Sequence, residues 1–143
     1  MECIVSSILE FEPVQEGEEA GMTVFMNEQF HYEIALTLIE ERKTVLLRKR
    51  VGSLSVMESQ IGYQGTTIKL EVEADTKWYT FSFYNLHGKK IRLGRGERGL
   101  LSSEVAGGFT GVYFGLYATG NGRPSASPAY FDLFNYSIHN REV

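Results

Sequence analysis

The stretch Thr67-Ile68-Lys69-Leu70-Glu71-Val72-Glu73-Ala74 alternates polar and apolar residues from end to end. Successive side chains of a β-strand point to opposite faces, so this alternation predicts a strand with one solvated and one buried face. The stretch from Trp78 to Tyr84 follows after a turn signal and places Tyr79, Phe81 and Phe83 on one face. Both stretches therefore predict strands that cover a hydrophobic core.

The same period of two extends over most of the chain. Apolar rows from Phe30 to Leu38, from Val112 to Ala118 and from Tyr130 to Ile138 predict three more strands, the last with Tyr130 in its apolar row and Asp132 inserted. Further strands are predicted near Ile8–Glu12, Gly21–Asn27, Thr44–Val51, Ser53–Ser59 and Lys89–Leu93. Many short strands separated by turn signals, without a helical period, predict an all-β sandwich of two antiparallel sheets.

Length and composition narrow the class of protein. The 143 residues predict a single domain, 1–143, and the net charge of -4 argues against a nucleic-acid partner. No apolar stretch is long enough for a membrane-spanning helix, so no membrane partner is expected. Glu2 at the N-terminus does not suit an export signal, and the lone Cys3 excludes an internal disulfide. We therefore expect a cytoplasmic protein, although a cleaved signal peptide would leave no trace and a secreted form stays open.

Glycines concentrate in one segment. Six of them lie between Arg92 and Gly111. Because glycine permits positive φ angles and close backbone approach, this density predicts a shaped loop rather than a strand. Long loops on a rigid sandwich commonly carry function.

No complete set of catalytic residues is present in the sequence. Glycoside hydrolysis needs two carboxylates across a cleft, whereas acids such as Glu16, Glu18 and Glu19 cluster as on a solvated face. The basic run from Arg48 to Arg50 is interpreted as a solvated strand edge or turn. We therefore expect no enzymatic activity of the chain alone.

Neither a metal site nor a cofactor is predicted with any specific motif. The three histidines lie in separate segments without the spacing of a ligand pair. Asp132 is flanked by Phe131 and Leu133, so its carboxylate either hydrogen-bonds to backbone or tyrosine, or contributes to a structural calcium site. Both interpretations of Asp132 stay open.

Aromatic residues are abundant, with one Trp, eight Tyr and nine Phe. Sugars stack their apolar faces on exposed aromatic rings, which makes Trp78 a candidate sugar-stacking residue. Aromatics also favour strands and fill sandwich cores, which is the alternative for each of them.

Two C-terminal stretches, 101–119 (LSSEVAGGFTGVYFGLYAT) and 128–136 (PAYFDLFNY), resemble the C-terminal domain of glycoside hydrolase family 43 β-xylosidases. Those domains carry an LSTEVAGGFTG-like loop and a PADFDWFEY-like last strand. Upstream, 9–13 (LEFEP) and 19–25 (EAGMTVF) are similar to early strands of the family. The chain departs from the pattern at Leu133, at Tyr130 and over residues 1–7, which match poorly.

The resemblance implies a concanavalin A-like jelly-roll sandwich. In the family this domain accompanies a five-bladed β-propeller that holds the catalytic carboxylates, and such a propeller is absent from the 143 residues. One loop of the sandwich is thought to reach the rim of the propeller's sugar pocket. The segment that best matches this loop contains Gly107, Gly108, Phe109 and Thr110, with Phe109 as an apolar wall.

Three functions follow as hypotheses. The first is a non-catalytic accessory domain that completes the sugar pocket of a family 43 propeller catalytic domain, its partner in xylan degradation. The second is a stand-alone carbohydrate-binding, lectin-like module that takes xylo-oligosaccharides. The third is a protein-interaction or oligomerisation domain, which would form a homo-oligomer through an exposed sheet face or unpaired edge.

Overall fold

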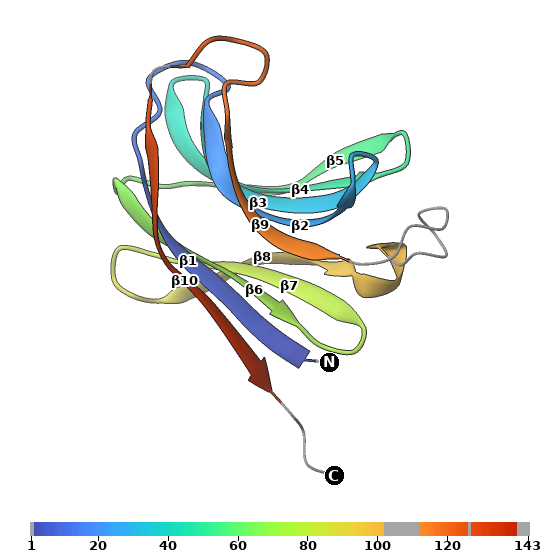
Figure 1. Cartoon of the computed structure of the whole chain (residues 1–143). Coiled ribbons are helices and arrows are strands. Elements are labelled where there is room, and N and C mark those ends of the chain that lie inside the picture. The colour runs from blue at the N-terminus through green and yellow to red at the C-terminus, as the bar shows by residue number, and fades with distance from the viewer. Residues whose placement is uncertain (1, 102–111, 126, 140–143) are drawn as a thin grey trace.

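A computed structural model describes residues 2–101, 112–125 and 127–139 and places them in two antiparallel sheets (Figure 1). The first sheet has the spatial order β10 (Ala129–His139), β1 (Glu2–Phe11), β6 (Thr67–Ala74), β7 (Trp78–Tyr84) and β8 (Lys90–Glu97). The second has the order β5 (Leu54–Gly62), β4 (Arg42–Val51), β3 (Phe30–Ile39), β2 (Glu19–Asn27) and β9 (Tyr113–Thr119). The predicted two-sheet sandwich is confirmed.

The core lies between the two sheets and is rich in aromatic rings. Tyr79, Phe81 and Phe83 of β7 are buried on one face, as the alternation of the strand predicts. Tyr32 of β3 reaches them from the opposite sheet, and its ring lies edge-on to Tyr79 and Phe81 at centroid distances of 6.1 and 6.0 Å. Edge-to-face packing is a favourable arrangement for aromatic pairs, so Tyr32 joins the two sheets at the centre of the core.

Part of the glycine-rich segment is a strand, and the prediction of a loop from Arg92 onward was wrong there. β8 runs to Glu97 and contains Gly94 and Gly96. A Cβ at Gly96 would lie 2.6 Å from the ring of Tyr32, and one at Gly94 would lie 3.0 Å from Leu47. These glycines therefore allow the backbone of β8 to approach the opposite sheet closely.

The N-terminal segment also forms more structure than its sequence predicts. β1 begins at Glu2, although the sequence predicts a strand only near Ile8–Glu12, and it lies between β6 and β10 in the sheet. Ser6 and Ser7 interrupt the apolar alternation, yet both are buried because strands cover β1 on both sides. A central position in the sheet thus overrides the weak local pattern.

A register shift changes the orientation of residues along the last strand. β1 and β10 lose their regular register between Ser6 and Ile8, which indicates a β-bulge. Phe131 packs against the core, whereas Tyr130 is 61% exposed. The prediction of Tyr130 in the apolar row was therefore wrong, because a bulge alters which residues face inward.

The connections gather at two ends of the sandwich (Figure 1). The η1 end holds the β2–β3, β4–β5 and β6–β7 turns and the 3-10 helix η1 (Arg98–Leu101), which precedes β9. The β9–β10 end holds the β1–β2, β3–β4, β5–β6, β7–β8 and β9–β10 connections. Among the described residues, no helix has the length and apolar character that a membrane crossing requires.

Candidate functional site

The predicted pocket loop starts and ends on the core at the η1 end. Gly107, Gly108, Phe109 and Thr110 themselves lie outside the described residues. On one side of the loop Leu101 is fully buried, and on the other Val112 packs against the core. The attachment points of the loop are therefore held by apolar packing, while its assignment to a sugar pocket stays a prediction.

Trp78 lies at the η1 end of β7 and is half-buried. The guanidinium carbon of Arg95 lies 3.8 Å from the centroid of its ring, in a cation–π contact between β7 and β8. One face of the ring is thus covered by a cation. A sugar would have to use the other face or displace Arg95, and the role of Trp78 in sugar stacking stays a prediction.

Asp132 lies on the edge strand β10, with its side chain exposed. Its backbone carbonyl accepts a hydrogen bond from Ser7 Oγ at 3.3 Å. Within the described part of the chain, no group of three or more potential metal ligands includes this carboxylate. The interpretation of Asp132 as a calcium ligand stays a prediction.

The outer face of the second sheet carries an ion-pair network that the sequence did not reveal. Arg48 is half-buried and donates through both terminal nitrogens to Glu19, and through Nε at 3.3 Å to Glu33. His31 Nε2 lies 3.3 Å from Glu33, and Tyr117 donates its hydroxyl to Glu19. The interpretations of Arg48 as a solvated edge residue and of Glu19 as a solvated acid were wrong.

This network satisfies itself. Burial would raise the pKa of the Glu33 carboxyl, but the neighbouring His31 and Arg48 lower it to about 2. Both carboxylates are held by the same guanidinium, so they do not form the free acid–base pair that glycoside hydrolysis requires. The network therefore ties three strands together instead of providing catalytic groups.

Glu18 is a second buried carboxylate with a structural role. Its side chain is 1% exposed and accepts hydrogen bonds from the amides of Val14 at 2.8 Å and Gln15 at 2.7 Å. Ser127 Oγ donates at 2.9 Å, and Ser125 Oγ is a fourth donor. Burial would raise the pKa of Glu18, but these donors lower it to about 2. Its interpretation as a solvated acid was wrong, because it connects the β1–β2 and β9–β10 loops.

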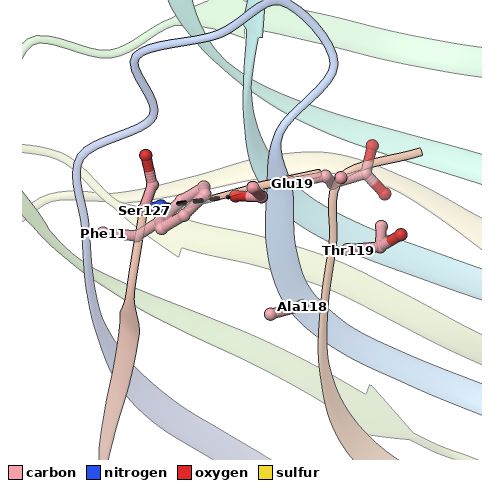
Figure 2. A pocket seen from close by; sticks show the side chains of 7 residues that line it. Phe11, Glu19, Ala118, Thr119 and Ser127 are labelled. Atoms are coloured by element: carbon pink, nitrogen blue, oxygen red, sulfur yellow. Dashed lines mark hydrogen bonds between the residues drawn. The ribbon is translucent and has the colours of Figure 1, made fainter. Parts of the chain in front are cut away.

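A small hollow of about 230 Å³ lies beside this connection (Figure 2). Figure 2 shows Phe11 and Ser127 on one side of it and Glu19 and Thr119 on the other. Glu19 is already held by Arg48 and Tyr117. The hollow therefore presents a carboxylate that is engaged elsewhere and offers little that a ligand could bind.

A larger groove lies at the same end and is named here the Tyr130 groove. Its first part, about 320 Å³, is lined by Glu10, Phe11, Glu12, Thr66, Pro128 and Tyr130. Its second part, about 760 Å³, shares Glu12 and continues past Val14, Glu41 and Tyr63. Sequence reasoning missed it because β10 pairs with β1 across more than a hundred residues of chain, with Tyr130 opposite Glu10. The one local signal is the exposed pair of acids around Phe11.

Comparison with known proteins connects this fold to carbohydrate-active enzymes. The model of the beta xylosidase C-terminal concanavalin A-like domain matches residues 1–137. The chain is 35% identical over 133 residues to the non-reducing end alpha-L-arabinofuranosidase BoGH43B of Bacteroides ovatus, covering 92% of this chain and 25% of that protein.

Solved structures show the same relationship. A Bacteroides ovatus structure described as xyloglucan PUL GH43B superimposes with a TM-score of 0.91 at 31% identity, covering 96% of this chain and 27% of that one. The xylan beta-1,4-xylosidase from Bacillus halodurans C-125 shares the fold, with a TM-score of 0.86 at 21% identity over 96% of this chain and 28% of that one. The chain thus spans about a quarter of the length of these relatives. It belongs to the family of β-xylosidase C-terminal concanavalin A-like domains, the accessory sandwich of glycoside hydrolase family 43 proteins.

Proposed function

We propose that this chain is a non-catalytic sandwich that completes the sugar pocket of a family 43 propeller domain acting on xylan-type polysaccharides. The observation that carries the proposal is the coverage of its relatives: nearly the whole chain matches only a quarter of an arabinofuranosidase. The acids of the Arg48 network, which are held in ion pairs, agree with the absence of catalysis.

The contribution to the pocket is assigned to the segment around Phe109. Leu101 and Val112 hold both ends of this segment against the core. An apolar ring carried between such anchors would pack against the sugar and exclude water from the reacting bond. The acid, the base and the remaining sugar contacts would belong to the propeller.

A domain exchange tests the proposal. The matching quarter of the Bacteroides ovatus arabinofuranosidase is replaced by this chain, and kcat/KM is measured on an aryl arabinofuranoside. We expect an active chimera, a Phe109→Ala variant at least tenfold less active, and a Tyr130→Ala control at the other end that keeps full activity. Equal activity of the Phe109→Ala variant would refute the pocket role.

The chain alone provides a second test. Purified without a propeller, it should not hydrolyse aryl xylosides or aryl arabinofuranosides above the uncatalysed rate. Turnover that co-purifies with the chain, and that a carboxylate variant such as Glu33→Gln abolishes, would contradict the assignment as an accessory domain.

A further inference from the structure

The Tyr130 groove lies at the end of the sandwich opposite the pocket loop. The loop departs from η1 and returns to β9 at the η1 end, whereas Tyr130 follows the β9–β10 connection (Figure 1). Strands of seven or more residues separate the two ends. The groove is therefore distinct from the pocket proposed above, and its occupant need not enter that pocket.

The walls of the groove are held rigidly by hydrogen bonds. The Phe11 amide donates to the Thr66 carbonyl at 3.0 Å, and the Tyr63 hydroxyl donates to the Thr67 carbonyl at 2.6 Å. Lys43 Nζ lies 2.9 Å from Glu12 Oε2 and 2.7 Å from the Gly65 carbonyl. These contacts order the β5–β6 loop before any ligand arrives, which reduces the entropic cost of binding.

Two exposed groups in this rigid frame are not engaged. The ring of Tyr130 is 61% exposed, and Glu10 lies directly opposite on β1 with its side chain exposed. Within the described ranges, neither the Tyr130 hydroxyl nor the Glu10 carboxylate has a hydrogen-bond partner. An amphipathic ring beside free acceptors, in a hollow of about 320 Å³, is a typical ligand site.

The chemistry of the groove favours a neutral, hydroxyl-rich ligand. The carboxylates of Glu10 and Glu12 repel anions such as phosphates and uronates. Lys43 already compensates the charge of Glu12, which reduces the attraction for a basic peptide. A pyranose ring offers C–H groups to a tyrosine face and hydroxyl donors to carboxylates. The extension of about 760 Å³ beyond Glu12 provides room for further sugar units.

We propose that the Tyr130 groove binds a neutral oligosaccharide chain, with a sugar ring stacked on Tyr130 and its hydroxyls donating to Glu10 and Glu12. The groove would hold a second stretch of polysaccharide away from the catalytic pocket. Attachment at two points raises the effective concentration of polymer at the enzyme without altering the chemical step.

The test is a titration of the 143-residue chain with xylohexaose and with a xyloglucan oligosaccharide, followed by amide chemical shifts. We expect saturable binding to at least one of them, with shifts confined to the β9–β10 end. Tyr130→Ala should weaken binding about tenfold, as expected when a stacked ring is lost. Tyr113→Ala is the matched control, because Tyr113 is also 61% exposed but lies at the η1 end.

Further arms decide between outcomes. Glu10→Gln keeps the side-chain shape and should weaken sugar binding, and it serves as the second variant if Tyr130→Ala perturbs the fold. A trilysine peptide is titrated in parallel; its binding through Glu10, with no response to sugars, would overturn the proposal in favour of a basic protein partner. Absence of saturable binding to either oligosaccharide, or equal effects of Tyr130→Ala and Tyr113→Ala, would also overturn it. None of these outcomes depends on Phe109 or a propeller.

Discussion

Substitution of Gly96 by alanine tests the close approach of β8 to the opposite sheet. The added Cβ would lie 2.6 and 2.8 Å from two ring carbons of Tyr32, against about 3.5–4.0 Å for a favourable carbon–carbon contact. Tyr32 is fully buried, donates its hydroxyl to the Glu97 carbonyl at 2.6 Å, and cannot move without losing that bond. An overlap of roughly 1 Å in a packed core costs about 1–3 kcal/mol of unfolding free energy.

An opposing effect reduces this cost. Alanine restricts the unfolded chain more than glycine does, which stabilises the fold by about 0.4–1 kcal/mol where the backbone permits it. We therefore expect Gly96→Ala to lower the unfolding free energy by a net of about 1–2 kcal/mol. The midpoint of thermal unfolding should fall by roughly 3–8 °C for a domain of this size.

Gly115→Ala is the control for this prediction. Gly115 also lies within a strand, but its Cβ would meet only Thr23 at 3.5 Å, an ordinary contact. This variant should be neutral or slightly stabilised. Urea unfolding followed by the fluorescence of the single tryptophan, Trp78, measures both. A Gly96→Ala protein as stable as the Gly115→Ala protein would refute the steric argument. The cost should also shrink in a Tyr32→Leu background, because the two residues are in contact.

Three more predictions concern the buried polar groups. Arg48→Met should lower the unfolding free energy by about 3–5 kcal/mol in urea titrations, because Glu19 and Glu33 lose their common cation; a change below 1 kcal/mol would show that water replaces it. The pKa of Glu18 falls from 4.5 to about 2 on folding, so the stability it contributes is complete above pH 4.5 and is lost as the pH falls towards 2. Glu18→Gln should therefore be less stable than the unsubstituted chain at pH 7, and the difference should narrow between pH 4.5 and 2; a constant difference would exclude this linkage. Tyr32→Phe should cost about 1 kcal/mol in thermal unfolding, the loss of one buried hydrogen bond, and no change would show that the hydroxyl contributes nothing.

Local alternation was sufficient to predict most of the strands. β6 and β7 have the residues that their pattern predicts, because a strand covered on one face imposes a period of two on its own sequence. The family was also recognisable, since its segments 101–119 and 128–136 are contiguous. Fold class and family were thus accessible from short stretches of chain.

Tertiary structure alone decided the rest. Gly96 belongs to a strand because it faces Tyr32, a residue far away in sequence, and no local pattern reports that contact. Glu18 is buried because donors from the β9–β10 loop surround it, although its sequence neighbours are polar. The Tyr130 groove exists because β10 pairs with β1. Period and motif are properties of neighbouring residues, whereas burial of charge and the shape of a groove depend on which distant segments the fold brings into contact.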